Sequence, residues 1–125
     1  MVDIGAARQH FQKRERRRQA QREAERQQWL QRVREAGLCF AGQFPGVQKV
    51  YVFGSLTQPG RFRPASDIDM AVVCDSVEIE SAFWRAVERE LERVVDVRPL
   101  TGAIAEAVAN SGVKIYERQD FGIDQ

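Results

Sequence analysis

The stretch VQKVYVFGSLTQPGRFRPASDIDMAVV, residues 47–73, decides the fold of this chain. Its first part, 47–53, is rich in β-branched and aromatic residues and predicts a strand that stops abruptly at Gly54. Residues 56–66 contain two prolines and a glycine, so we expect a loop with room for one short helical turn. Residues 67–73 predict a second strand whose apolar residues alternate onto one face, namely Ile68, Met70 and Val72.

The chain after this stretch alternates helical and strand patterns. Residues 78–93 carry apolar residues at helical spacing and predict an amphipathic helix, and residues 94–98 predict a third strand. Thr101 is placed to cap a short helix that reaches about residue 109, and residues 113–117 predict a last strand. The element order predicts an α/β domain with a small mixed β-sheet and helices packed against it.

The N-terminal part differs from the rest in composition. Residues 1–28 are dominated by Arg, Gln, Glu and Ala, so we expect a basic helical arm that is solvated or depends on a partner. From Trp29 onward apolar residues recur at helical spacing, which predicts that the helix docks on the core until Gly37 and the turn at 44–46 end it. We therefore divide the chain into the arm, one domain over 29–118 and a C-terminal tail over 119–125.

Charge follows the same division. The net charge of the chain is +1, but residues 1–35 hold ten Arg and Lys against five Asp and Glu, whereas residues 36–125 hold nine against thirteen. A basic arm on a mildly acidic body calls for two separate explanations. No apolar run approaches the ~20 residues that span a bilayer, and the N-terminus lacks the apolar segment of a signal peptide, so we expect a cytoplasmic protein.

Histidine and cysteine chemistry is disfavoured by the composition. The single histidine, His10, lies in the arm, which makes histidine-based catalysis and histidine-rich metal sites improbable. Cys39 and Cys74 lie in apolar surroundings outside any CxxC spacing, and we expect both to be buried free thiols. The aromatic side chains of Trp29, Trp84 and Tyr51 are expected to pack rather than to stack on bases.

Three aspartates are the candidate metal ligands. Asp67 and Asp69 are two residues apart in a predicted strand, so both carboxylates leave the same face and repel each other unless a cation lies between them. Hard oxygen ligands favour Mg²⁺ or Mn²⁺. Asp96 is flanked by two valines and also faces out of the apolar layer. If the two strands are neighbours, the three carboxylates suit a pair of metal ions, although an Asp-x-Asp pair alone more often faces solvent.

The Gly54-Ser55 turn is the candidate phosphate site. A strand that stops at Gly-Ser offers backbone N–H groups and a hydroxyl with no Cβ in the way, which suits phosphate oxygens. It is not a P-loop, because no GxxxxGK[ST] pattern occurs. Taken alone, such a pair is more often an ordinary turn at the end of a strand.

Gly-Ser, a polar loop, SDIDMAV and a later VDV together resemble the polymerase-beta-like nucleotidyltransferases, and within them the antitoxin-type minimal nucleotidyltransferases. The resemblance covers roughly residues 29–118. It implies that Gly54 and Ser55 hold the β- and γ-phosphates of ATP and that Mg²⁺ or Mn²⁺ is held by three aspartates. It also implies that one of these aspartates assists deprotonation of the acceptor and that a small polar residue precedes the pair. By this resemblance Asp67, Asp69 and Asp96 are the metal ligands, and Asp96 also assists the deprotonation. Ser66 is the small polar residue before the pair, placed to cap the loop or to hydrogen-bond in the cofactor-binding site.

The match departs from the family in the loop. Eleven residues separate Ser55 from Asp67, one more than the commonest spacing, and Leu56-Thr57-Gln58-Pro59-Gly60 stands where Ala-Arg-Gly is frequent. The details of phosphate and base contacts are therefore open, whereas the metal ligands are retained. Arg61 and Arg63 lie within reach of phosphates along the chain, but a solvated loop arginine is the commoner case.

The resemblance also implies a partner. Many minimal nucleotidyltransferases are encoded beside a helical HEPN-type ribonuclease toxin and act as its antitoxin, some by adenylylating a toxin tyrosine. We therefore expect an ATP-using protein adenylyltransferase. Three alternatives stay open: an antitoxin that acts by docking alone, a nucleic-acid-directed transferase that uses the basic arm, and an antibiotic-modifying enzyme, for which the chain looks short unless a homo-oligomer forms the pocket.

Overall fold

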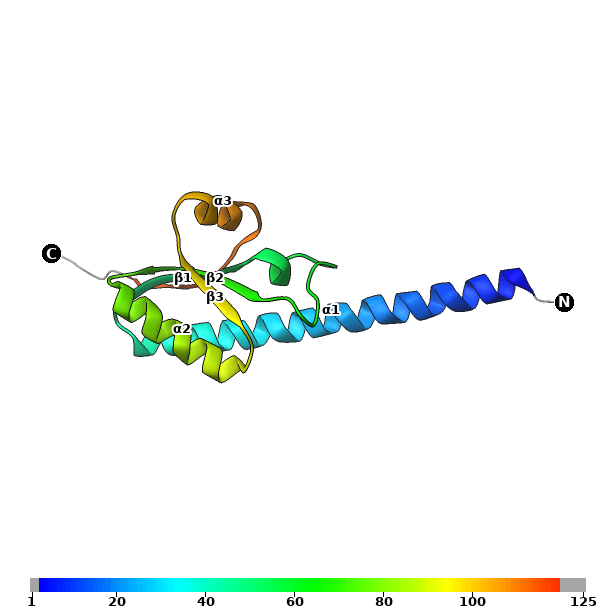
Figure 1. Ribbon diagram of the computed structural model, residues 1–125, viewed down its shortest axis with the longest axis horizontal. Helices are drawn as coiled ribbons and strands as arrows, with labels where there is room; N and C mark the ends of the chain where they lie inside the picture. The colour runs from blue at the N-terminus through cyan, green and yellow to red at the C-terminus, as the bar shows by residue number, and fades with distance from the viewer. Residues whose placement is uncertain (1–2, 120–125) are drawn as a thin grey trace.

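A computed structural model describes residues 3–119 of the 125-residue chain. Its elements, in chain order, are α1 (Ile4–Gln43), β1 (Val47–Phe53), the 3-10 turn η1 (Gly54–Thr57), β2 (Ile68–Cys74), α2 (Val77–Leu91), β3 (Val95–Pro99), α3 (Gly102–Ser111) and β4 (Val113–Glu117). The four strands form one sheet in the order β3-β2-β1-β4, with α1 and α2 on one face and α3 on the other (Figure 1). The α/β fold with a small mixed sheet is confirmed.

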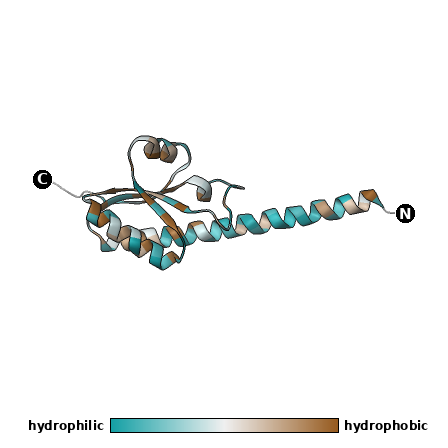
Figure 2. Ribbon diagram, viewed as in Figure 1, coloured by the Kyte–Doolittle hydropathy of each residue, from teal (hydrophilic) through white to brown (hydrophobic). Residues whose placement is uncertain are grey.

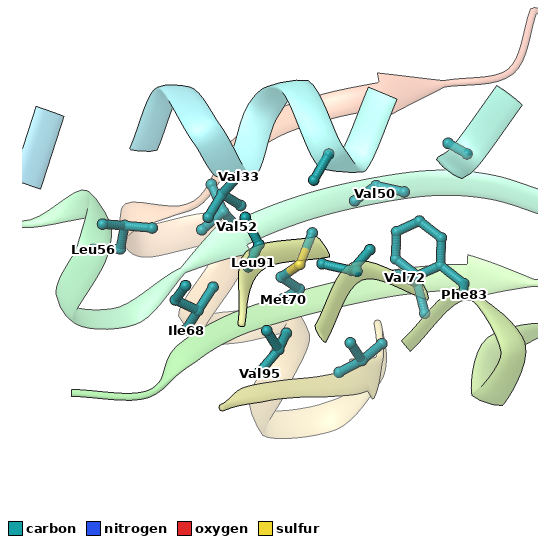
Figure 3. Packing of buried hydrophobic residues seen from close by; sticks show 14 of the residues in the cluster. Val33, Val50, Val52, Leu56, Ile68, Met70, Val72, Phe83, Leu91 and Val95 are labelled. Carbon is teal, nitrogen blue, oxygen red and sulfur yellow. The ribbon is translucent and has the colours of Figure 1, made fainter. Parts of the chain in front are cut away.

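The sheet is mixed because its connections differ. β1 runs antiparallel to both β2 and β4, whereas β2 and β3 are parallel and need the crossover helix α2 between them. The predicted alternation in β2 is confirmed, since three apolar side chains enter the core on the α1 and α2 side, 0–1% exposed: Ile68, Met70 and Val72. Figure 3 shows these side chains packed with Val33 of α1 and Phe83 of α2.

Helix α1 is longer than the sequence predicted. It continues through Gly37 to Gln43, so the expectation that Gly37 helps to end the helix is wrong. Gly37 is buried inside the helix, where a Cβ would lie 3.1 Å from Cγ2 of Ile115 in β4. Glycine here serves close packing of the helix on the sheet rather than a turn. The helix ends just before the Phe44-Pro45-Gly46 turn, as its second stop signal indicated.

The first half of α1 projects from the body. Residues 4–22 of the predicted arm are exposed apart from a half-buried Glu15, and Figure 2 shows that most residues of this segment are hydrophilic. Docking on the body begins at Arg26, which is 6% exposed, one turn earlier than the predicted start at Trp29. Within residues 3–119, no helix is long and apolar enough to cross a membrane.

The other helices follow the predicted ranges closely. The Ser76 hydroxyl caps α2 by accepting from the Ile79 N–H at 3.2 Å. Thr101 occupies the predicted N-cap position of α3, but its side chain makes no capping hydrogen bond. The predicted tail, 119–125, lies outside the described residues except for position 119.

The expectation for the cysteines is wrong for one of them. Cys39 is exposed on α1, whereas Cys74 is half-buried at the end of β2. Burial, together with the nearby charges of Glu80 and Asp75, raises the pKa of the Cys74 thiol to about 11. Both cysteines are free thiols, and Cys74 is held in its neutral form at physiological pH.

Candidate active site

The predicted site residues lie at one edge of the sheet. β2 and β3 both begin there, and Asp69 is the direct register partner of Asp96 across the parallel pair. The end of β1 reaches the same place, because Phe53 is the antiparallel partner of Asp69 and Gly54 follows it. Asp69 and Asp96 alternate with buried residues and therefore lie on the sheet face opposite α1 and α2.

Asp69 experiences the charge of both other carboxylates. Asp69 is half-buried, and this burial makes the largest contribution to the raised pKa of its carboxyl group. The negative charges of Asp96 and then of Asp67 raise it further, and Arg98 offsets part of this effect. Negative potential is thus concentrated at Asp69, which like Asp96 is partly removed from water, and a bound cation would relieve it.

The three carboxylates are close but not yet arranged as metal ligands. Asp67 precedes β2 and is exposed, and Oδ2 of Asp96 accepts a hydrogen bond from Nε of Arg98 at 3.0 Å. Across residues 3–119, no three His, Cys, Asp or Glu side chains are grouped so that they could hold a metal ion as they stand. The donor chemistry suits Mg²⁺ or Mn²⁺, but the carboxylates of Asp67 and Asp96 must turn toward Asp69 to share an ion.

Gly54 is the residue that lets Asp69 approach the Gly-Ser turn. Its φ is +78°, in the left-handed region, and a Cβ at this position would overlap Oδ2 of Asp69. The Gly54 carbonyl accepts hydrogen bonds from Oγ1 of Thr57 and Nε2 of Gln58, both at 3.0 Å. Thr57 and Gln58 belong to the segment that replaces the frequent Ala-Arg-Gly of the family. Their hydrogen bonds hold the turn in its sharp conformation.

Ser66 is engaged within its own loop. Its hydroxyl accepts from the backbone N–H of Arg63 at 2.9 Å, and its N–H donates to the Arg63 carbonyl at 3.0 Å. The Ser66 hydroxyl and N–H therefore stabilise the turn that precedes Asp67. Arg61 and Arg63 are exposed, and Arg63 also donates to the Gly60 carbonyl at 2.9 Å.

Two arginines that sequence reasoning did not single out hold the loop segments of the site. Arg26 of α1 donates to the Leu56 carbonyl at 2.8 Å in a buried position and pairs with Glu23 at 2.6 Å. Its place three residues before Trp29, on the docking face, is the signal that could have revealed it. Arg93 donates to three backbone carbonyls of the loop before Asp67. A lone arginine after an amphipathic helix gives no comparable signal.

A shallow hollow lies on the same side of the sheet, between its strands and α3. It has a volume of about 380 Å³ and is lined by Tyr51, Leu100, Ala105, Val108, Ala109, Gly112 and Lys114. Tyr51 pairs with Ala71, two residues from Asp69 on the same face, so the hollow and the carboxylates share one surface. Tyr51 is half-buried in this hollow. Trp84, another aromatic residue predicted to pack, donates its indole N–H to the Val95 carbonyl at 2.6 Å.

Residues 39–121 match the family described as Polymerase beta, Nucleotidyltransferase. The chain belongs to this family. The matched range begins near the C-terminal end of α1 and includes the Gly-Ser turn and all three aspartates, so the polymerase-beta nucleotidyltransferase signature is carried by the body and not by the arm. No curated protein matches the chain in sequence.

Solved structures show the same fold. A toxin–antitoxin structure with AMP-PNP matches with a TM-score of 0.57 and 24% identity, covering 69% of this chain and 74% of that chain. The toxin–antitoxin MntA-HepT matches with a TM-score of 0.52 and 20% identity, covering 70% of this chain and 73% of that chain. At these identities the likeness establishes the polymerase-beta nucleotidyltransferase fold and leaves the acceptor open.

Proposed function

We propose that this nucleotidyltransferase transfers AMP from ATP to a protein hydroxyl and serves as the antitoxin of a helical HEPN-type toxin. The observation that carries the reaction class is the close approach of Gly54 to Asp69, with Asp96 paired beside it. This juxtaposition puts a phosphate-binding type of turn directly against carboxylates. The partner is supported by the toxin–antitoxin structures that share the fold, one of them obtained with AMP-PNP.

The residues divide the work of the reaction. Gly54 and Ser55 would hold the β- and γ-phosphates, while Asp67, Asp69 and Asp96 would hold Mg²⁺ or Mn²⁺. When bound, the metal neutralises the charge of the triphosphate and of the attacking oxygen. The acceptor oxygen forms a bond to the α-phosphorus of ATP. The bond between the α-phosphorus and the oxygen that links the α- and β-phosphates breaks, and pyrophosphate leaves. Asp96 accepts the hydroxyl proton, and the hydrogen bond from Arg98 engages only its Oδ2.

The test uses the full chain with labelled ATP, Mg²⁺ and the product of the neighbouring gene. We expect label to appear on that partner and to be lost in Asp67→Ala, since the loss removes a metal ligand. Arg85→Ala in α2 is the control, because this exposed side chain makes no ion pair within residues 3–119 and α2 covers the sheet face opposite the carboxylates. If the wild-type chain leaves the partner unlabelled, the proposal that AMP is transferred to the partner is refuted.

Neutralisation by docking alone is the second candidate, and the projecting arm favours it. Residues 4–22 present a long basic surface that the body does not use. The double variant Asp67→Ala, Asp69→Ala separates the two candidates when each chain is co-expressed with the toxin. Full neutralisation by the double variant removes the enzymatic account of protection, whereas loss of neutralisation by a stably folded double variant removes docking as a sufficient one.

A further inference from the structure

Arg93 joins the turn after α2 to the loop that leads into Asp67. Its guanidinium donates to the Ser66 carbonyl through Nε at 3.1 Å and through Nη2 at 2.7 Å. The same Nη2 lies 2.9 Å from the Arg63 carbonyl and 3.0 Å from the Pro64 carbonyl. One side chain thus gathers three carbonyls from the four residues directly before Asp67.

Aromatic rings hold the guanidinium in place. The Arg93 guanidinium carbon lies 4.4 Å from the ring centroid of Phe62, in the loop, and 4.7 Å from that of Trp29, in α1. A planar guanidinium can stack on aromatic rings and use its in-plane N–H groups for hydrogen bonds at the same time, which an ammonium cannot do. The loop is therefore tied through Arg93 to the docked half of α1.

The segment after Asp67 is held by the same turn. The Ile68 N–H donates to the Val94 carbonyl at 3.1 Å, so Arg93 and Val94 fix the backbone on both sides of Asp67. The charge of Asp67 also acts on Arg93, where it partly offsets the lowering of the arginine pKa by burial. Asp67 has neither a strand partner nor a buried position of its own, so its backbone depends on these anchors.

We propose that Arg93 is the positioning residue for Asp67: by anchoring residues 63–66 it fixes the backbone position from which the Asp67 carboxylate can share an ion with Asp69 and Asp96. The inference rests on the proposed metal-dependent function, which it deepens. Arg93 acts through the loop backbone and not as a ligand. Its positive charge alone would oppose metal binding, so a charge-conserving substitution separates anchoring from charge.

The experiment compares Arg93→Lys with Arg32→Lys. Arg32 stacks on the same Trp29 ring, at 4.3 Å, but its guanidinium donates to the Leu91 carbonyl at 3.5 Å and not to the loop. Mn²⁺ binding is measured by electron paramagnetic resonance with AMP-PNP present, and amide hydrogen exchange is followed over residues 61–68. For Arg93→Lys we expect about a tenfold loss of Mn²⁺ affinity, typical of a removed supporting contact, and faster exchange confined to the loop.

The outcomes are distinct. Wild-type values in Arg32→Lys together with both changes in Arg93→Lys support the proposal. An Mn²⁺ affinity in Arg93→Lys equal to that of the wild type overturns it, even if the loop exchanges faster. Equal losses in the two variants also overturn it, since they indicate a general effect on the Trp29 stack. A wild-type chain that binds Mn²⁺ no more tightly than Asp67→Asn refutes the proposed metal site itself, before any arginine variant is compared.

Discussion

Replacing Gly54 with alanine adds one methyl group at the point where the Gly-Ser turn meets Asp69. The structure supplies a matched control, because Gly60 has the same φ of +78° but no atom within 4 Å of the position that its Cβ would take. Both substitutions place an L-residue in the left-handed region. Only Gly54→Ala also drives a Cβ into the Asp69 carboxylate.

The backbone term should be similar in the two variants. A left-handed conformation costs alanine roughly 1–2 kcal/mol, and a less flexible unfolded chain returns part of this, so we expect a net loss of about 1 kcal/mol from either change. For a chain of this length that loss lowers Tm by roughly 3–6 °C. The collision adds a displacement of Asp69 on the order of 1 Å, and a misplacement of that size in an active site can cost about a hundredfold in rate.

Circular dichroism on heating and calorimetric titration with Mn²⁺ and AMP-PNP measure the two effects separately. We expect similar losses of Tm, with a loss of Mn²⁺–AMP-PNP binding of at least about tenfold in Gly54→Ala alone. Binding that is equally strong in both variants would refute the reasoning, because the Gly54–Asp69 contact would then have no part in the site.

Three further predictions follow from individual side chains. Arg26→Met should lower the free energy of unfolding in urea by about 1–3 kcal/mol, because the Leu56 carbonyl loses its buried donor, whereas Arg18→Met removes only an exposed ion pair worth about 0.5 kcal/mol or less; equal losses would contradict this. Asp69→Asn should raise the free energy of unfolding of the metal-free chain at neutral pH, because the pKa of the Asp69 carboxyl is raised in the folded chain and its charged form therefore destabilises the fold. This gain in stability should vanish as the pH falls below 3.8, the ordinary pKa, since the carboxyl is then neutral in the folded and the unfolded chain. At pH 8, Ellman's reagent should modify exposed Cys39 while Cys74, with a pKa of about 11, stays unreacted in the folded chain; equal rates would argue against its burial.

Regular periodicity made the fold predictable from sequence. The strand ranges 47–53 and 113–117 agree with β1 and β4, and β2, β3, α2 and α3 differ from their predicted ranges by one or two residues at their ends. The sequence prediction failed at a glycine, because glycine can either end a helix or allow a helix to pack closely on a neighbouring element. Gly37 was interpreted as a helix stop, yet it permits close packing on Ile115, a contact from far along the chain that no local pattern reveals.

The site was predictable to the extent that it follows strand alternation. Alternation placed Asp69 and Asp96 on one face, and their register pairing brings them side by side. Asp67 lies just outside β2, so alternation alone does not settle its direction. The Arg93 contacts join residues about thirty positions apart through backbone carbonyls, and backbone acceptors leave no mark on the identity of the residues that carry them.

The continuous helix α1 has a geometric consequence for the arm. Each residue of an α-helix turns by about 100° and advances by about 1.5 Å, and no break separates the arm from the docked half. A single alanine inserted near Arg22 would therefore leave the body in register while rotating the whole outer face of the arm by about 100° relative to the carboxylates. Four inserted residues would nearly restore the direction and move the face outward by about 6 Å. Insertions in α1 can therefore change the distance and orientation of a bound partner relative to the active site without changing the residues of the site.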